Sequence, residues 1–414
     1  MPQFCKLKNP SNVSIKGRIH LNGSKSISNR LLILDAISSG IDIDNLSNAL
    51  DTTTLKCLLQ TQDSLLDAGA GGTTFRFLTA YLAIQDGREV ILTGSDRIQE
   101  RPIGILVDAL NKLGADITYL GNCGFPPLKI IGKKLSGGKI EIPADTSSQF
   151  ITALLLIAPT LENGIELKLL GKVVSGSYIK MTLSLLEYFG VNTSYVDNTI
   201  IVKPGIFNSI PFFVEADWSA AAYYYAMVIL AEDMEIELEG LANQGMQGDA
   251  VIADIAAYFG VETVWKEHSI IIRKHKLLLP KSLEIDFLDC PDLAQTVIVF
   301  CAALGVELYC KGLQTLRTKE TDRILALDNE LKRLSLATLK EIDKDNWKLE
   351  ITSPMDLTAD VLIHTYDDHR MAMAFAPLVF LNKDLSILHP EVVVKSYPDF
   401  WEDLMRLGVT IEWD

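Results

Sequence analysis

The stretch ALNKLGADI, residues 109–117, carries the pattern that decides the fold: an apolar helix, a glycine that ends it, and the start of a strand. The phrase recurs as LLEYFGVNT (185–193), IAAYFGVET (255–263) and LMRLGVTI (404–411). Its glycines stand at 114, 190, 260 and 408, so the intervals are 76, 70 and 148 residues, the last being two steps of 74. Halfway along that double step lies ELKRLSLAT (330–338), with Ser335 in place of the glycine. Helix–glycine–strand turns are common because glycine supplies the left-handed residue that ends a helix, but their even spacing indicates an internal repeat.

Each period has room for a second helix and about four strands. Strand-like apolar runs occupy residues 139–142, 164–170, 199–202 and 269–273, and a further strand-like run of valines precedes Lys395. A unit of about seventy residues fits nearly six times into the chain, which predicts two similar α/β halves rather than a thin solenoid. The boundary is expected near residues 214–217, after the strand-like run 210–215, so one domain spans residues 22–214 and the other spans 1–21 together with 215–414.

Composition excludes several classes of protein. With 48% apolar residues among 414, a packed globular protein is expected throughout. The net charge of −15 disfavours non-specific binding to nucleic acid or anionic membranes. The longest mostly apolar stretch, 218–231, is too short to span a bilayer, and no export signal is visible at the amino terminus. We expect neither nucleic acid nor membrane among the partners.

The six cysteines form no close pairs in the sequence, which argues against a disulfide framework or a thiolate metal site. Free thiols suit a reducing compartment, so a cytoplasmic location is expected. His364 and His369 stand five residues apart, but no further ligand set accompanies them. The sequence therefore predicts no metal and no cofactor.

Six stretches place polar or charged residues where a helix is expected to begin. They are GSKSISNR (23–30), GGTTFR (71–76), DRIQERPIG (96–104), DTSSQF (145–150), RTKETDR (317–323) and YDDHR (366–370). A helix amino terminus has unpaired N–H groups and a partial positive charge, so it attracts anions. Lys or Arg at that end costs roughly 0.3–1 kcal/mol unless something negative compensates. The compensating group is either a bound anion, such as phosphate, or a nearby Asp or Glu.

Each stretch also has an ordinary structural interpretation. DTSSQF can be a plain helix cap formed by Asp145, Thr146 or Ser147. Asp292 precedes the apolar run VIVFCAALG and can likewise be a cap. In RTKETDR the acids can pair with the neighbouring cations on a solvated face. A lone histidine is more often structural, but His369 is flanked by an acid and an arginine, which leaves a functional and a structural role equally open.

Taken together, these stretches resemble the enolpyruvyl transferase family, in its shikimate branch. The resemblance runs from Gly23 to about Phe400, in the family's order. Its motifs are GSKSISNR, GTTFR, ERPIG, SSQF, VSGSY, EADWSAAAY, QGD, PDLAQT, RTKETDR, DDHRMAMAF and KSYPD. The resemblance implies two domains, each of three βαβαββ-type repeats in an inside-out α/β barrel, with the active site in the interdomain cleft. We expect a monomer. Its domains should close when substrate binds, because the like charges of the two halves resist closure in the empty protein.

The resemblance implies transfer of the enolpyruvyl group of phosphoenolpyruvate to the 5-hydroxyl of shikimate 3-phosphate, a step of aromatic amino-acid biosynthesis. Shikimate 3-phosphate would be bound by Lys25, Ser26, Arg30, Ser147, Ser148, Gln149, Ser175, Tyr178, Asp292 and Lys319. Phosphoenolpyruvate would be bound by Lys25, Gly72, Arg101, Gln149, Arg323, Arg370 and Lys395. Asn22, Ala70 and Thr315 depart from the family's usual Pro, Asn and Asn.

The chemistry needs a base at the 5-hydroxyl, an acid at the methylene carbon and a cationic cradle for the tetrahedral adduct. Asp292 is expected to be the base and Glu320 the main group at the methylene, with Lys25 and His369 assisting. Two alternatives are a transferase for UDP-N-acetylglucosamine and a non-catalytic anion-binding protein on the same fold. The first carries a cysteine before its Arg-Pro segment, and residues 95–104 contain none.

Overall fold

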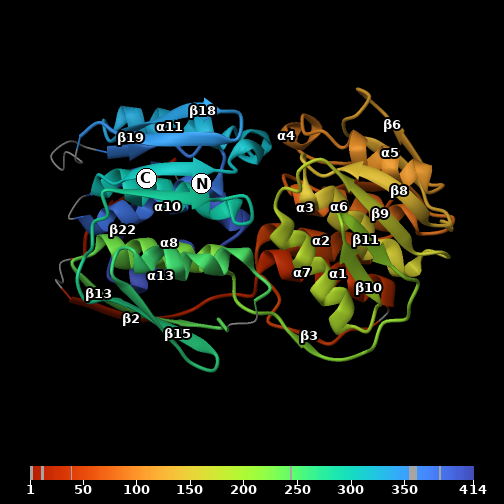
Figure 1. Cartoon of the computed structure of the whole chain (residues 1–414), viewed down its shortest axis with the longest axis horizontal. Helices are drawn as coiled ribbons and strands as arrows, with labels where there is room; N and C mark the ends of the chain where they lie inside the picture. Colours follow the sequence, from red (N-terminus) through yellow and green to blue (C-terminus); the bar gives the residue numbers. More distant parts are fainter. Residues whose placement is uncertain (1–2, 11–13, 39, 243–244, 354–360, 382–383) are drawn as a thin grey trace. The chain divides into compact units, whose positions relative to one another are not determined.

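The computed structural model describes residues 3–10, 14–38, 40–242, 245–353, 361–381 and 384–414. The chain divides into two compact units (Figure 1). Unit 1 comprises Met1–Gly23 and Glu215–Asp414, and unit 2 comprises Ser24–Val214. Unit 2 is therefore an insertion into the chain of unit 1.

Unit 2 contains two complete βαβαββ repeats. The first consists of β4 (Leu65–Asp67), α3 (Gly72–Ala83), β5 (Glu89–Thr93), α5 (Gly104–Lys112), β6 (Asp116–Tyr119) and β7 (Leu128–Ile131), with the short α4 (Asp96–Gln99) before α5. The second consists of β8 (Gly138–Pro143), α6 (Ser148–Ile157), η1 (Ala158–Thr160), β9 (Ile165–Leu170), α7 (Gly176–Tyr188), β10 (Thr193–Val196) and β11 (Thr199–Val202). Each forms a four-stranded sheet in which the first two strands are parallel and the others antiparallel.

The remaining repeat of unit 2 is shorter than the sequence predicts. It consists of α1 (Lys25–Ser38), β3 (Ile43–Asp44), α2 (Leu50–Gln60) and β12 (Phe212–Phe213). β12 and β3 pair in parallel, with Phe212 opposite Ile43. In the described part of the chain this sheet has two strands and lacks the antiparallel pair of the other repeats.

Unit 1 contains three complete repeats. One is continuous: β16 (Ser282–Asp286), η3 (Pro291–Leu293), α10 (Ala294–Leu304), β17 (Glu307–Lys311), η4 (Gln314–Thr318), α11 (Arg323–Arg333), β18 (Ala337–Asp343) and β19 (Asn346–Ile351). The second is split by the insertion after its first strand: β2 (Ser14–His20), then α8 (Trp218–Leu230), β13 (Asp233–Glu239), η2 (Gly248–Val251), α9 (Ile252–Ala257), β14 (Val261–Trp265) and β15 (Ser269–Lys274). The third takes its last strand from the amino terminus: β20 (Val361–Ile363), α12 (His369–Phe375), η5 (Ala376–Leu381), β21 (Leu385–Leu388), η6 (Pro390–Lys395), α13 (Phe400–Arg406), β22 (Thr410–Trp413) and β1 (Phe4–Lys8).

The turn glycines occupy equivalent places in the repeats. Each follows the second helix and has positive φ: 102° at Gly114, 87° at Gly190, 83° at Gly260 and 91° at Gly408. Ser335 takes the same conformation, with φ of 56°. The periodicity of the sequence is thus confirmed as the helix-to-strand turn that every complete repeat needs.

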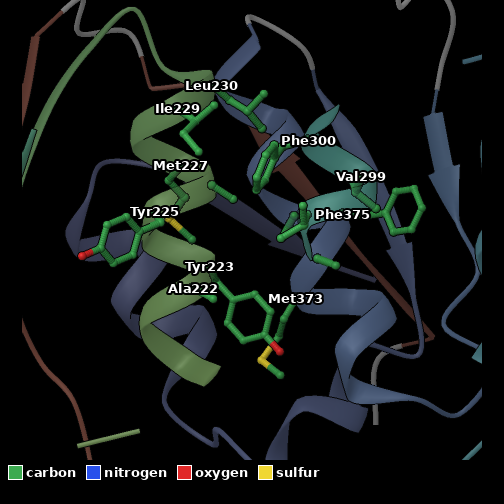
Figure 2. Packing of buried hydrophobic residues seen from close by; sticks show 14 of the residues in the cluster. Ala222, Tyr223, Tyr225, Met227, Ile229, Leu230, Val299, Phe300, Met373 and Phe375 are labelled. Carbon is green, nitrogen blue, oxygen red and sulfur yellow. The ribbon is translucent and has the colours of Figure 1, made fainter. Parts of the chain in front are cut away.

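The first helix of each repeat is the buried one. In unit 1, α8 packs with α10 and α12, and Figure 2 shows Tyr223 and Met227 of α8 in the same buried cluster as Phe300 of α10 and Phe375 of α12. Every residue of α8 except Ser219 is buried. This explains its continuous apolar sequence, since a helix surrounded by protein needs no polar face. None of the described helices is long and apolar enough to cross a membrane.

One sequence interpretation is wrong. The run before Lys395 reads as a strand, but Pro390–Lys395 forms a 3₁₀ helix, η6, which opens with proline. The helix places Lys395 in a buried position.

Candidate active site

The polar stretches begin helices, as the sequence predicts. Helices α1, α3, α6, α11 and α12 start at Lys25, Gly72, Ser148, Arg323 and His369, and the remaining stretch contains α4 and leads into α5. Ser147 caps α6 through the amide of Gln149, so the cap interpretation holds for this residue. Asp292 lies within η3 rather than capping α10, and its carboxylate forms ion pairs instead.

In unit 2, Lys25 is held at the start of α1 by a carboxylate from α2. Its Nζ lies 3.2 Å from Oδ2 of Asp51, and both side chains are largely buried. The main-chain carbonyl of Asp51 accepts a hydrogen bond from Thr74 on α3. Three helix starts are therefore joined around one ammonium group.

Gly72 lies against two guanidinium groups. A Cβ at this position would be 2.6 Å from Nη1 of Arg101 and 2.7 Å from Nη1 of Arg76, so only glycine fits without displacing them. Arg76 also donates to the carbonyl of Gly72 at 2.9 Å. Two buried cations beside the start of α3 form an electropositive site suited to a carboxylate or phosphate.

Gln149 and Thr73 join α6 to α3, because Nε2 of Gln149 donates to Oγ1 of Thr73 at 3.0 Å. Oε1 of Gln149 is buried and accepts no hydrogen bond within the described residues. Ser148 is buried beside it, and Ser175, with φ of 52°, precedes α7 in a left-handed conformation.

Arg30 is directed into unit 2. Its guanidinium donates to Thr182 at 2.9 Å, to Thr152 at 3.3 Å and to the carbonyls of Ser26 and Tyr178 at 2.7 and 3.2 Å. These contacts use four of its five N–H groups. Burial lowers its pKa to about 10. In this conformation Arg30 binds helices α1, α6 and α7 together and has one N–H group left for a ligand.

In unit 1, Arg323 lies at the centre of a buried ion-pair network. Its Nε lies 2.7 Å from Asp368, Nη1 lies 3.1 Å from Asp292, and Nη2 lies 2.9 Å from Glu320. Burial alone would lower the pKa of Arg323, but the three carboxylates outweigh it and raise that pKa. The two predicted proton-transfer groups, Asp292 and Glu320, are thus bound by one guanidinium.

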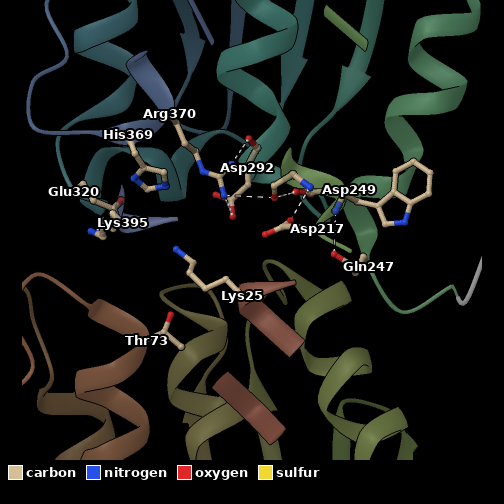
Figure 3. Close-up of polar contacts among 12 residues, drawn as sticks. Lys25, Thr73, Asp217, Gln247, Asp249, Asp292, Glu320, His369, Arg370 and Lys395 are labelled. Atoms are coloured by element: carbon tan, nitrogen blue, oxygen red, sulfur yellow. Dashed lines mark hydrogen bonds and ion pairs between the residues drawn. The ribbon is translucent and has the colours of Figure 1, made fainter. Parts of the chain in front are cut away.

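A second arginine continues the network. Figure 3 shows the Arg370 guanidinium directed at Asp292, with Nη2 2.8 Å from Oδ2. Arg370 also donates to Tyr223 at 3.3 Å and to Ser219 at 3.5 Å. Ser219 in turn donates to Asp249. Burial, followed by the charge of Asp292, raises the pKa of Asp249 to about 7, against the opposing effect of Arg370.

Lys395 closes the network from η6. Its Nζ donates to Oε1 of Glu320 at 2.9 Å, so each oxygen of Glu320 faces a different cation. His369 is 1% exposed, and its Nδ1 lies 3.6 Å from Asp368. Lys319 directly follows η4 in the chain and its side chain is half-buried. Thr315, within η4, has a buried hydroxyl with no hydrogen-bond partner among the described residues.

The predicted site residues therefore gather into two groups. In unit 1, a network of ion pairs joins Asp292, Glu320, Arg323, Arg370 and Lys395. In unit 2, Asp51 links Lys25 to Thr74 at the start of α3. At the same helix start, Arg101 lies against Gly72 and Gln149 donates to Thr73. No group of three or more His, Cys, Asp or Glu in the described ranges has a geometry that could hold a metal ion.

Sequence reasoning missed four members of these groups. Asp51, Arg76 and Asp368 contact predicted site residues, and Asp249 contacts Ser219. Asp249 lies in the QGD motif and Asp368 in DDHR, so both stood in quoted stretches without a role. Asp51 had no local signal, because its partner is 26 positions away in the sequence.

Comparison with known proteins identifies the family. The model for EPSP synthase (3-phosphoshikimate 1-carboxyvinyltransferase) matches residues 56–404. The chain belongs to the EPSP synthase family. The family's curated 3-phosphoshikimate 1-carboxyvinyltransferase from Bacteroides fragilis strain YCH46 is 45% identical over 401 residues, covering 96% of this chain and 97% of that protein. The protein of the same name from Shewanella halifaxensis is 35% identical over 426 residues, covering 95% and 97%.

Solved structures share the fold of the EPSP synthase family. EPSP synthase from Acinetobacter baumannii superimposes with a TM-score of 0.78 at 22% identity, covering 99% of this chain and all of that one. The enolpyruvyl transferase NikO from Streptomyces tendae has a TM-score of 0.74 at 14% identity, covering 99% of both chains. These two matches support the two-unit α/β architecture, and the sequence relatives carry the functional assignment.

Proposed function

We propose that the two groups of residues described above carry out the reaction of the EPSP synthase family. The chain transfers the enolpyruvyl group of phosphoenolpyruvate to the 5-hydroxyl of shikimate 3-phosphate and releases phosphate. The observation that most strongly supports the assignment of residues is the Arg323 guanidinium, which binds both Asp292 and Glu320. One cation thereby fixes the spacing of two carboxylates that the chemistry needs as separate proton-transfer groups.

Unit 1 would supply the acid–base groups. Asp292 takes the proton from the 5-hydroxyl, and the resulting oxygen attacks C2 of phosphoenolpyruvate while Glu320 protonates the methylene carbon. The tetrahedral adduct then loses a methyl proton to Glu320 and expels phosphate. Lys395, hydrogen-bonded to Glu320 at 2.9 Å, is suited to stabilise its ionised form, and His369 to assist at the methylene.

The cations of unit 1 are already compensated by carboxylates. Arg323 faces three of them, and Arg370 and Lys395 face one each. The electrostatic cost of cations at the starts of α11 and α12 is thus offset within the unit. An incoming phosphate or carboxylate would share these cations with Asp292 and Glu320, which strengthens the carboxylates as bases.

Unit 2 would supply most of the substrate-binding groups. Lys25, Arg101, Gln149 and the backbone of Gly72 are proposed to bind phosphoenolpyruvate, with Lys25 contacting both substrates. Ser26, Ser147, Ser148, Ser175 and Tyr178 are proposed for shikimate 3-phosphate, together with Gln149, Lys319 and Asp292. Arg30 joins this set through its remaining N–H group, or by a change of rotamer.

Replacing Lys25 tests the role of unit 2. Lys25→Ala should lower the turnover number by orders of magnitude and leave the fold intact, because among the described residues its ammonium group forms a single ion pair, with Asp51. The exposed lysine of the neighbouring helix provides the control, Lys56→Ala. Near-normal phosphate release by Lys25→Ala would refute the role.

Replacing Glu320 tests the acid–base assignment. Glu320→Gln should slow exchange of solvent deuterium into the methylene of phosphoenolpyruvate in the presence of shikimate 3-phosphate. Unchanged exchange would assign the proton transfer to another group, since the amide cannot carry a proton to carbon.

Two alternatives make different predictions. A UDP-N-acetylglucosamine transferase would release phosphate with that sugar nucleotide, and a non-catalytic protein would bind shikimate 3-phosphate in a calorimeter yet release none. The curated relatives favour neither alternative.

We also propose that the enzyme acts as a monomer in the cytoplasm, because one chain supplies every residue assigned here and its six cysteines are free thiols. Size-exclusion chromatography with light scattering tests the monomer.

A further inference from the structure

The segment that leads into α12 is strained. Tyr366 and Asp367 both have left-handed backbones, with φ of 54° and 56°. Residues with side chains rarely adopt this conformation in succession, and they keep it only where their surroundings impose it. Asp368, His369 and Arg370 follow directly, so the geometry of this turn decides where those three side chains lie.

A buried carboxylate on α11 holds this turn. Glu330 is 1% exposed, yet it pairs with groups from the segment before α12. Its Oε2 accepts from the amide of His364 at 3.2 Å, and its Oε1 accepts from the Tyr366 hydroxyl at 2.9 Å. Burial, followed by the Glu330 carboxylate, raises the pKa of Tyr366 to about 12, so the phenol remains a donor at neutral pH.

Arg333, one turn further along α11, strengthens the attachment. It pairs with Glu330 and donates to the carbonyl of Leu362 in β20. Glu330 therefore receives hydrogen bonds from Arg333, His364 and Tyr366, and a buried carboxylate with this many donors is firmly fixed.

The other end of the same segment is attached to the same helix. Asp368 binds Arg323, the first residue of α11, at 2.7 Å and also caps α12 through the amide of Arg370. Glu330 lies seven residues after Arg323, which is about two helical turns. Helix α11 therefore binds both ends of segment 364–368, one through Glu330 and the other through Arg323.

We propose that Glu330 is a positioning residue for the reaction: through Tyr366 and His364 it fixes the strained turn that places Asp368 and Arg370 on Arg323 and Asp292. The inference rests on the proposed function, in which Arg370 binds phosphoenolpyruvate. Glu330 itself touches no substrate in this account, and nothing in the sequence pattern assigns it a role.

The test compares three variants with wild-type enzyme. Tyr366→Phe removes one hydrogen bond to Glu330, and Glu330→Gln turns one acceptor oxygen into a donor facing other donors. Lys332→Gln is the control, because Lys332 lies on the same helix, is 52% exposed and pairs only with Asp328 among the described contacts. Amide hydrogen exchange, thermal unfolding and KM for each substrate are measured for all four proteins.

We expect amide exchange at residues 364–370 to accelerate about tenfold in Tyr366→Phe, the factor for losing one hydrogen bond to a charged group. KM for phosphoenolpyruvate should rise by a similar factor, while KM for shikimate 3-phosphate and the Lys332→Gln control remain unchanged. Glu330→Gln should show a larger change in the same direction.

Two results would overturn the proposal. One is unchanged exchange at residues 364–370 in both Tyr366→Phe and Glu330→Gln. The other is faster exchange throughout unit 1 with a lower melting temperature and unaltered KM, which would make Glu330 a general stabilising residue. If wild-type enzyme releases no phosphate, the proposed function fails, and the exchange measurement alone still decides whether Glu330 holds the turn.

Discussion

Replacing Asp249 by Asn should change how the stability of unit 1 depends on pH. Asp249 is buried, and its pKa is raised from 3.8 to about 7. The folded protein therefore keeps this proton at pH values where the unfolded chain has lost it. Stability falls as pH rises from about 4 to about 7 and then levels off, and the full cost is about 4 kcal/mol at 1.36 kcal/mol per pKa unit. Asn cannot ionise, so the variant escapes this cost.

The expected signature is a difference that grows with pH. The free energy of unfolding of Asp249→Asn minus that of wild type should increase by about 2–3 kcal/mol between about pH 5 and about pH 8. Urea titration followed by tryptophan fluorescence is the assay, because all five tryptophans, at 218, 265, 347, 401 and 413, lie in unit 1. The exposed Asp254, in the adjoining α9, gives the control Asp254→Asn. A difference that is flat across this range would refute the reasoning about Asp249.

Three further substitutions test the fold and the ion-pair network. Gly72→Ala should raise KM for phosphoenolpyruvate while costing at most about 1–3 kcal/mol in stability, because the new Cβ meets the movable ends of Arg101 and Arg76; an unchanged KM would contradict this. Ser335→Gly should stabilise unit 1 by about 0.5–1 kcal/mol in urea titrations by relieving a left-handed serine, and a loss of stability would show that the turn is not strained. Arg323→Leu should destabilise unit 1 by about 3–5 kcal/mol, since it leaves the buried Asp368 without its cation, and a loss below about 1 kcal/mol would exclude a central role for this network.

The fold could be predicted from the sequence because its repeat is marked by local chemistry. A helix that turns into a strand needs one left-handed residue, and glycine at 114, 190, 260 and 408 shows where that turn recurs. The reduced repeat of unit 2 could not be predicted in this way, since α2 ends at Gln60 and is followed by Thr61 with an extended backbone instead of such a glycine. Lys395 was misread because a run of valines predicts a strand, whereas the proline at 390 starts a 3₁₀ helix.

The candidate site was predicted as a set of residues but not as a set of contacts. Helix starts and family motifs identify Arg323, Asp292 and Glu320, while the ion pair between Arg323 and Asp292 depends on tertiary packing across 31 residues of sequence. The sequence also could not predict that the Arg30 guanidinium points into unit 2, because its partners Thr152 and Thr182 lie on other helices. Asp249 and Glu330 were not predicted as important, because their roles depend on the burial of their carboxylates, and the sequence alone does not show which acidic residues are buried.

The most direct test of the whole account is phosphate release by the purified chain. With phosphoenolpyruvate and shikimate 3-phosphate together, we expect one phosphate for each shikimate 3-phosphate consumed, and none when either is omitted or when UDP-N-acetylglucosamine replaces the shikimate. Absence of release despite binding of both substrates in a calorimeter would contradict the assignment, as would release that depends on the sugar nucleotide.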